Sequence, residues 1–377
     1  MKKQDSIQSI QLYPSCIPVK GYSRCIMIDL FRTRYFFVPF LFYQIFNRSS
    51  LVNVSELLKT YNKNTIMEYM SFLKENELAY FDDITSGFSR IPLDWDCPAI
   101  ISNGIIDVRS INEEHITRVL NSLSFLGCEA IQLFIPIDIT LAFLKIFFNQ
   151  IKNSRVNTVE LIVDYGIEST SVELINSEMK TENRLIKTLF FNAPKNESKI
   201  ISPYSKKIII YTSEKLDLFN DCGNIHPFLF TNNIPFFTES QHHNTCLNRK
   251  ICIDANGNIK NCPAMAKSFG NIKDTTLEEA INKPGFKDLW YICKDQIDVC
   301  KDCEFRYMCT DCRCFIKDPG NIYSQPAKCT YNPYICLWEG QEGYVPVEEC
   351  GTYSRETGFV PDKKRIAELN KQIWGEE

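Results

Sequence analysis

The cysteines of this 377-residue chain constrain its fold more than any other feature, because most of them lie in one region. Ten of the seventeen fall between Cys246 and Cys329, and the stretch CKDCEFRYMCTDCRC, from Cys300 to Cys314, is the densest. Disulfide frameworks, zinc sites and iron–sulfur clusters all use closely spaced cysteines. The odd total excludes complete pairing within one chain, and we expect a metal or cluster site in a C-terminal module.

The composition is that of a globular protein with no strong charge bias. Hydrophobic residues make up 44% and charged residues 23% of the chain, and the net charge is −4. A chain with this net charge shows no excess of basic residues that would attract nucleic acid or anionic lipid. The first residues, MKKQDSIQSIQLYPS, are too polar for a signal peptide, and the longest apolar run, YFFVPFLFYQIF, is too short to span a bilayer. We predict a cytoplasmic protein with no nucleic-acid and no membrane partner.

The sequence divides into three regions, 1–95, 96–240 and 241–377, of mixed α/β and α+β character. The first region predicts three short strands, in SCIPVKG, RCIMIDL and RYFFV, followed by three helices. The second helix begins at Asn53, an N-cap with Glu56 three residues later. This order is winged-helix-like. The helices lack the basic face that DNA binding needs, so the order favours a peptide-recognition unit.

The middle region alternates strand and helix patterns. The runs IISNGIIDV, AIQLFI, TVELIVD and KKIIIYT are typical of buried parallel strands, and the amphipathic segments EEHITRVLNSLSFLG and TLAFLKIFFNQIKNS lie between them. Such a βα repeat predicts a parallel sheet or a partial barrel. The region lacks a glycine-rich phosphate loop of either common kind.

The C-terminal module has two cysteine arms. The first holds three cysteines: Cys246, Cys252 and Cys262. An Asn-Gly turn at residues 256–257 predicts a hairpin that brings the last two to the same end. The second arm is a C-x2-C-x5-C-x2-C run with two cysteines after it: Cys300, Cys303, Cys309, Cys312, Cys314 and Cys329. Two arms fit two four-thiolate clusters, and zinc remains an open alternative because both metals accept tetrahedral thiolate.

The register of these cysteines, with Gly257 in the first arm, resembles the SPASM domain, the C-terminal extension of many radical S-adenosylmethionine peptide maturases. The resemblance implies two [4Fe-4S] clusters. It assigns Cys246, Cys252, Cys262 and a cysteine just after Cys309 to the first, and Cys300, Cys303, Cys309 and Cys329 to the second. The usual C-x3-C at the end of the run is missing, since position 313 is Arg. Cys312 is therefore favoured as the fourth ligand of the first cluster, with Cys314 as the alternate.

The motif that defines radical S-adenosylmethionine enzymes is missing from the sequence. Those enzymes need a C-x3-C-x2-C loop after the first barrel strand, and no two cysteines in this chain are four positions apart. After IISNGIIDV the chain instead reads RSINEEHIT. We interpret the middle region as a degenerate radical-SAM-like barrel and expect no S-adenosylmethionine cofactor.

A narrower resemblance covers nearly the whole chain. The segments SCIPVKGYSRCIMIDL, GCEAIQLFI and CEFRYMCTDCR resemble the SPASM-domain peptide maturase of grasp-with-spasm systems, a branch of RiPP biosynthesis. The resemblance implies two partners, a ribosomally made precursor peptide and an ATP-grasp ligase. It also implies that the N-terminal unit binds the leader peptide.

The strand at residues 34–38 is the predicted peptide-binding edge, because edge strands can accept an extended peptide as a further strand. The candidate contacts come from this strand and the third helix: Tyr35, Phe36, Phe37, Ile66, Tyr69, Met70 and Leu73. No catalytic residues can be named. Two other functions stay open, a redox enzyme that acts on the peptide through its clusters and a zinc-stapled interaction protein.

The missing loop generates the first prediction. Because no thiolate triad of the required spacing is present, the reduced protein should not cleave S-adenosylmethionine to 5′-deoxyadenosine above background. Chromatography of anaerobic reactions measures this product, and formation at a rate proportional to protein concentration would overturn the degenerate-barrel interpretation.

Overall fold

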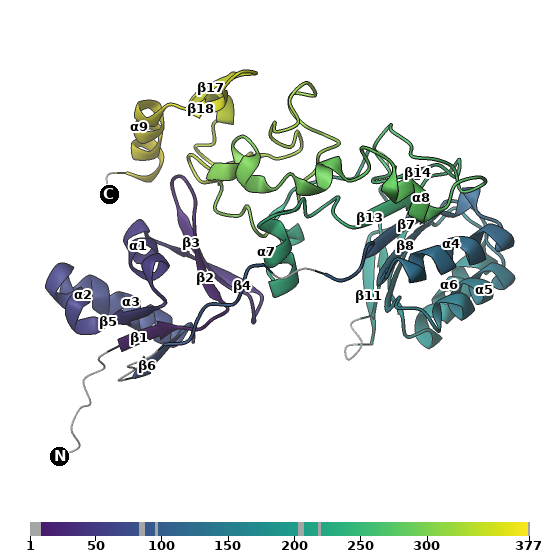
Figure 1. Cartoon of the computed structure of the whole chain (residues 1–377), viewed down its shortest axis with the longest axis horizontal. Coiled ribbons are helices and arrows are strands. Elements are labelled where there is room, and N and C mark those ends of the chain that lie inside the picture. The colour runs from purple at the N-terminus through teal and green to yellow at the C-terminus, as the bar shows by residue number, and fades with distance from the viewer. Residues whose placement is uncertain (1–8, 83–86, 95–96, 203–206, 218–219, 376–377) are drawn as a thin grey trace, which may run out of the picture. The chain divides into compact units, whose positions relative to one another are not determined.

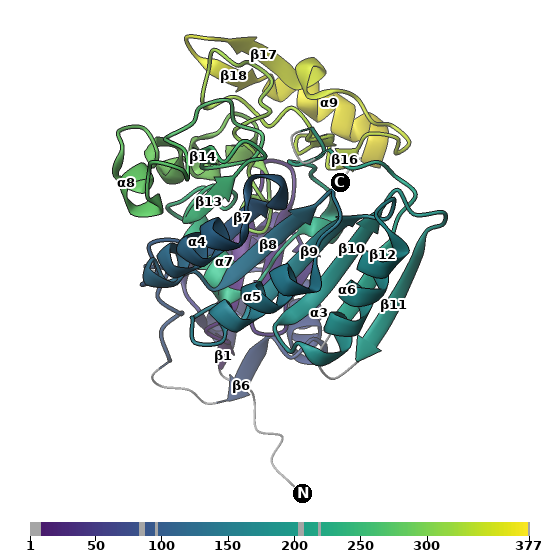
Figure 2. The ribbon, with the colours of Figure 1, turned by 90° about the vertical axis from the view of Figure 1, so that its right-hand side faces the viewer.

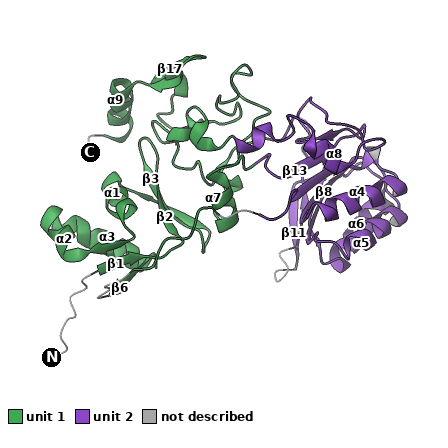
Figure 3. Cartoon of the chain, viewed as in Figure 1, with its two compact units in different colours: residues 1–96, 223–245, 292–377 green, residues 97–222, 246–291 purple. Residues whose placement is uncertain are grey.

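The computed structural model describes residues 9–82, 87–94, 97–202, 207–217 and 220–375 (Figure 1). Residues 95 and 96, where the first predicted boundary lies, fall outside the described residues. The chain forms two compact units (Figure 3). Residues 1–96, 223–245 and 292–377 make up the first unit, and residues 97–222 and 246–291 make up the second.

These units differ from the predicted division at residue 240. The first cysteine arm joins the βα region in the second unit, and the second arm joins the N-terminal region in the first unit. The cysteine module is therefore split between two cores.

An eight-stranded sheet forms the centre of the second unit. Its strands are β7 (Asn103–Asp107), β8 (Ala130–Ile135), β9 (Thr158–Asp164), β10 (Leu185–Phe191), β11 (Glu197–Ser202), β12 (Lys207–Tyr211), β13 (Lys250–Ile253) and β14 (Ile259–Lys260). Their order is β11-β12-β10-β9-β8-β7-β13-β14, and the pairs from β12 to β13 are parallel. The predicted parallel sheet is confirmed. Antiparallel partners, β11 and β14, end it on either side.

Three helices lie on one face of this sheet (Figure 2). They are α4 (Glu113–Phe125), α5 (Leu141–Ile151) and α6 (Ser169–Thr181), and the unit also holds η1 (Val108–Ser110), α8 (Leu277–Asn282) and η3 (Asp288–Tyr291). Side-chain caps fix where the helices start, as Asn112 accepts from the His115 N–H and Thr140 from the Phe143 N–H. The apolar stripes of the helices pack on the alternate buried residues of the strands, such as Leu133, which is fully buried.

The N-terminal part of the first unit contains two three-stranded sheets. One is β2 (Cys16–Lys20), β3 (Cys25–Asp29) and β4 (Arg34–Val38), and these are the three predicted strands. The other, with β1 (Ser9–Leu12) between β5 (Leu51–Asn53) and β6 (Ala79–Asp82), was not predicted. The helices are α1 (Phe40–Arg48), α2 (Val54–Thr60) and α3 (Lys63–Glu75), and Asn53 caps α2 as predicted. A short strand, β5, lies between α1 and α2, so the three predicted helices do not follow one another without interruption.

The rest of the first unit is made of short elements around the second cysteine arm. They are η2 (Pro227–Leu229), α7 (Ile234–Ser240), η4 (Lys294–Gln296), η5 (Cys300–Asp302), β15 (Tyr331–Asn332), β16 (Leu337–Trp338), η6 (Val347–Cys350), β17 (Gly351–Ser354), β18 (Gly358–Pro361) and α9 (Lys363–Trp374). Asp362 caps α9, whose residues Ile366 and Leu369 pack against buried Tyr334. Within the described residues, no helix has the length and apolar character needed to cross a membrane.

Candidate metal centres and peptide-binding edge

Lys294 lies among the thiols of the second arm. Its side chain is only 4% exposed, and its Nζ is 3.4 Å from the Sγ of Cys309 and 4.0 Å from the Sγ of Cys300. Cys303 and Cys329 complete the set that was predicted for the second cluster, and all of these residues belong to the first unit. The structure thus gathers this arm around a buried cation.

Tight backbone turns position these thiols. The Cys303 N–H donates to the Cys300 carbonyl at 3.0 Å, so the C-x2-C pair closes one turn. The turn begins at Val299, which has a φ of 67°. A left-handed conformation is unusual for a β-branched residue and indicates local strain that the surrounding packing sustains.

Burial dominates the acidity of the second arm. It raises the pKa of Cys300 and of Cys309 to about 11, and it also raises the pKa of Cys303 and Cys329. Burial alone would lower the pKa of Lys294, but the neighbouring thiolates of Cys300 and Cys309 raise it. The raised pKa values of the four cysteines favour the protonated thiols, so metal binding must displace these protons.

Arg313 occupies the position where the SPASM pattern would carry its last cysteine. It is buried, and its Nη2 donates to Asp311 Oδ1 at 2.7 Å while its Nη1 donates to the carbonyls of Ile322 and Ser324. Asn244 donates to the other carboxylate oxygen of Asp311 at 2.6 Å. The arginine is thus held by a buried ion pair and by two backbone carbonyls, which gives it a structural role.

The first arm forms the predicted hairpin. Strands β13 and β14 pair antiparallel, with Cys252 opposite Lys260, and Gly257 has a φ of 79° in the turn between them. Because side chains alternate along a strand, Lys250 and Cys252 project from the same face of β13. Cys252 and Cys262 are both buried.

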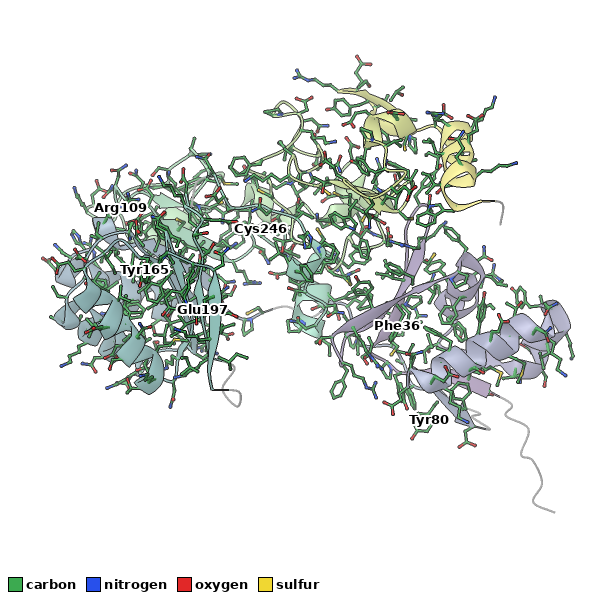
Figure 4. The ribbon with its side chains drawn as sticks, turned by 180° about the vertical axis from the view of Figure 1, so that it is seen from behind. Phe36, Tyr80, Arg109, Tyr165, Glu197 and Cys246 are labelled. Atoms are coloured by element: carbon green, nitrogen blue, oxygen red, sulfur yellow. The ribbon has the colours of Figure 1, made fainter. Side chains whose placement is uncertain are left out.

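Lys250 lies beside a cysteine of the first arm, just as Lys294 lies beside cysteines of the second arm. Its Nζ is 3.6 Å from the Sγ of Cys246, a residue labelled in Figure 4. A hydrogen bond with Cys222, followed by burial, raises the pKa of Cys262 well above its usual value. Burial would lower the pKa of Lys250, and the thiolates of Cys246 and Cys262 raise it.

The favoured fourth ligand of the first cluster lies in the other unit. Cys312 and Cys314 both belong to the first unit, while Cys246, Cys252 and Cys262 belong to the second. Cys312 is buried against Gly223, where an added Cβ would be 2.7 Å from the Cys312 Sγ. Among the described residues, no group of three or more His, Cys, Asp or Glu side chains is close enough to hold a metal ion.

The peptide-binding candidates divide into core and surface residues. Ile66 and Leu73 are 1% and 0% exposed and belong to the core, so their side chains cannot line a free surface. Tyr69 and Met70 are half-buried against the same core. Phe36, labelled in Figure 4, packs its ring 5.5 Å from that of Phe72 on α3. Of the candidate contacts on α3, only the half-buried Tyr69 and Met70 can therefore reach a bound peptide.

Tyr35 and Phe37 lie on the opposite face of the strand. Their rings are 5.7 and 6.1 Å from that of Phe305, which follows the first C-x2-C pair of the second arm, and Phe37 remains 50% exposed. The Arg24 guanidinium stacks 3.7 Å from the Phe37 ring and pairs with buried Glu304 at 2.9 Å. The β2–β3–β4 sheet and the second cysteine arm thus share one hydrophobic cluster within the first unit.

In the part of the chain that the structure describes, the outer backbone edge of β4 has no strand partner. The Leu30 N–H donates to the Ser15 carbonyl, so even-numbered residues of β3 bond to β2 and odd-numbered residues bond to β4. Met27 therefore bonds Phe36, and the backbone groups of Tyr35 and Phe37 point to the outer edge. Among the described strands, β4 pairs only with β3. The Phe36 N–H therefore faces β3, and the N–H groups of Tyr35 and Phe37 are the ones directed toward an added strand.

Lys250, Lys294 and Cys222 are the residues that sequence reasoning missed. The two lysines have no spacing signal, although each lies within six residues of a predicted ligand. Cys222 precedes the first arm by a long interval, and the spacing pattern assigns it no role. Only the fold brings these side chains to the cysteines.

Comparison with known families identifies the cysteine region. Residues 245–304 match the SPASM family, described as an iron-sulfur cluster-binding domain. The match covers the first arm, the spacer with α8, and Cys300 and Cys303 of the second arm. The chain therefore contains an iron–sulfur SPASM domain.

The match to solved structures is more distant. The chain is similar to Streptococcus suis SuiB bound to S-adenosylmethionine, with 10% sequence identity and a TM-score of 0.29. The similarity covers 81% of this chain and 96% of that chain. No curated protein matches the sequence.

Replacement of Cys303 by Ala tests the second arm. Two cubane clusters correspond to about eight irons per chain, so Cys303→Ala should reduce anaerobically purified protein to about four. It should also lower the melting temperature, because coordination contributes folding free energy. Iron and sulfide analysis gives the count. Cys293→Ala, a buried thiol in the same unit without an assigned role, should keep all the iron. Stoichiometric zinc without iron in the unaltered protein would contradict the assignment of iron–sulfur clusters.

Replacement of Lys294 by Met tests the buried charge. Removal of one positive charge beside a cluster favours its oxidised state, so the midpoint potential should fall by on the order of 100 mV. The relevant signal is the one that Cys303→Ala abolishes, followed by EPR in a redox titration. Lys301→Met, which removes a half-exposed lysine paired with Asp298, should leave the potential nearly unchanged. A potential unaltered in Lys294→Met at full iron content would show that this charge does not act on the cluster.

Proposed function

We propose that this chain is an iron–sulfur SPASM protein that binds a ribosomally made precursor peptide along β4 and assists its maturation together with an ATP-grasp ligase. The observation that carries the proposal is the free edge of β4 in a sheet packed on the second cysteine arm. The resemblance to grasp-with-spasm maturases supplies the partner enzyme and the class of peptide.

An extended peptide suits this edge for geometric reasons. The outward backbone groups of Tyr35 and Phe37 can pair with the main chain of an added strand, which gives affinity without regard to sequence. The half-exposed ring of Phe37 and the guanidinium of Arg24 offer contacts to side chains on one face of that strand. Specificity would then come from alternate residues of the leader peptide.

The packing beneath the edge supports a role for the metal centre in peptide handling. Arg24 of the β2–β3 turn pairs with Glu304, and Arg306 donates to the Lys20 carbonyl at 2.6 Å. Glu304 and Arg306 flank Phe305 in the second arm. The sheet and the arm are therefore joined by an ion pair, a hydrogen bond and shared apolar packing, and a cluster held by this arm would stabilise the peptide-binding sheet.

We assign [4Fe-4S] clusters to these cysteines because of the SPASM resemblance. The thiols of each arm would supply the sulfur ligands and the lysine beside them a counter-charge, the combination that an anionic cluster needs. When bound, such a cluster supplies a structural cross-link and a one-electron carrier. The chain's own residues bind it, exclude water through burial and, at Lys294 and Lys250, place positive charge beside it. These same charges favour a redox enzyme as the second candidate function.

The middle sheet is assigned to a degenerate barrel. At the end of β7, where a radical S-adenosylmethionine enzyme would begin its cysteine loop, Asp107 pairs with Arg109 at 2.6 Å and caps η1. This ion pair gives the segment a structural role. We assign the protein to the cytoplasm, where its thiols remain available for metal.

A proline substitution tests strand addition. Phe37→Pro should weaken binding of a fluorescein-labelled leader peptide by about tenfold, because it removes an outward N–H donor and edge strands tolerate proline there. Fluorescence anisotropy with the full-length chain measures the Kd, which we expect below roughly 10⁻⁵ M.

Phe37→Ala is the matched control for this test. It removes the same ring and keeps the N–H, so any extra loss in Phe37→Pro belongs to the backbone. Equal effects of the two substitutions would argue against strand addition, and no saturable binding by the unaltered chain would refute peptide binding on β4.

A further inference from the structure

The first metal centre needs a fourth ligand that the SPASM pattern does not provide in this chain. Three cysteines of the first arm lie in the second unit: Cys246, Cys252 and Cys262. A cubane cluster bound only by cysteines takes four. The sequence pattern points to Cys312, but position 313, where the pattern would place the cysteine, holds an arginine locked in a buried ion pair.

Cys312 is the competing candidate for that ligand. It belongs to the first unit, as do the four cysteines predicted for the second cluster. Its sulfur lies against Gly223, which has a φ of 79° and follows Cys222 directly in the chain. The test below therefore compares Cys222 with Cys312.

Cys222 lies with the first arm. Its thiol is hydrogen-bonded to that of Cys262, which is a buried member of the arm. The Lys250 ammonium interacts electrostatically with Cys222, Cys246 and Cys262 together. Cys222 therefore shares one cation with two of the predicted ligands, and it belongs to the same unit as all three.

We propose that Cys222 is the fourth thiolate of the first metal centre and, with Cys246, Cys252 and Cys262, replaces the ligand that the SPASM pattern takes from the second arm. The assignment deepens the metal-centre part of the proposed function. Each unit then holds one complete four-cysteine set with one lysine beside it, Lys250 in the second unit and Lys294 in the first.

The hydrogen-bonded pair has one competing explanation. Cys222 and Cys262 could form a disulfide on oxidation and serve no metal. Such a pair would leave Cys246 and Cys252 without partners, and it would exclude metal from the arm. The test below distinguishes the two states.

The test uses the full-length chain with Cys303→Ala, in which only the first centre is expected to load with about four irons. Cys222→Ala is added to it, and Cys312→Ala and Cys97→Ala are the comparisons. Cys97 is a half-exposed thiol of the same unit. We expect Cys222→Ala to lose at least about one iron per chain or to gain the EPR signal of a [3Fe-4S] cluster, and the other two variants to keep their iron. Retention of all iron in Cys222→Ala, or loss of the cluster in Cys312→Ala, would overturn the assignment.

Anaerobic alkylation by iodoacetamide with mass spectrometry gives a second measurement that does not depend on the stability of a variant. Cys222 is half-exposed, so it should be protected in loaded protein and modified after chelation. Cys97 should be modified in both states. Modification of Cys222 with the iron retained, or a Cys222–Cys262 disulfide in iron-loaded protein, contradicts the proposal.

These measurements separate this proposal from the proposed function. They count metal and thiols, so they give the same answer if the arm carries zinc, with zinc counted in place of iron. Failure of the leader peptide to bind would remove the proposed function and leave the assignment of Cys222 untouched.

Discussion

A lysine ammonium buried among thiols is the interaction on which the second cysteine arm depends. A neutral thiol is a weak hydrogen-bond acceptor, so it compensates poorly for the lost hydration of a buried cation. The Nζ of Lys294 lies beside the sulfurs of Cys300 and Cys309, and the carboxylate of Asp311 adds to the field that keeps it charged. Once the thiols become metal-bound thiolates, the ammonium gains counter-charges at close range. Lys294 therefore links the stability of the folded arm to its loading with metal.

The same arm also carries the N-terminal sheet. Glu304 follows Cys303 directly, is buried, and accepts a hydrogen bond from Tyr331 at 2.6 Å as well as the ion pair with Arg24. Burial raises its pKa, while Arg24 and Tyr331 lower it. A buried carboxylate in such a network is costly to leave without its partners. The sheet that contains β4 is thus held by residues that are adjacent in sequence to predicted metal ligands.

Local signals in the sequence were enough to predict several of these elements. The Asn53 cap, the β13–β14 hairpin with Gly257 in its turn, and the helices α4 and α5 follow from contacts between residues close in the chain. Strand β10 was missed because Lys187 and Thr188 interrupt its apolar run, although it lies between β9 and β12. Its identity as a strand comes from neighbours on both sides.

The candidate site could be predicted only in part, because some of its residues are brought together by the fold and not by local sequence. Cysteine spacing identifies both arms, since each C-x2-C or hairpin is local. The lysines beside them and the position of Cys222 depend on tertiary packing. The division of the module between two units likewise has no local signature, because it results from β13 joining the edge of the parallel sheet beside β7. Position 313 could be recognised as a departure, but only the structure shows the ion pair that occupies it.

Two proposed ligands of the first metal centre, Cys222 and Cys246, lie where the chain passes between its two units. The segment 223–245 leaves the second unit directly after Cys222 and returns to it at Cys246. A metal bound to both Cys222 and Cys246 would cross-link the two ends of this segment and close it into a loop. Closing a loop removes conformational entropy from the unfolded chain, and the free energy of metal binding would supply that constraint. Metal loading at this site would thus constrain the path of the chain as well as supply its chemistry, because one metal centre would hold both ends of the segment 223–245.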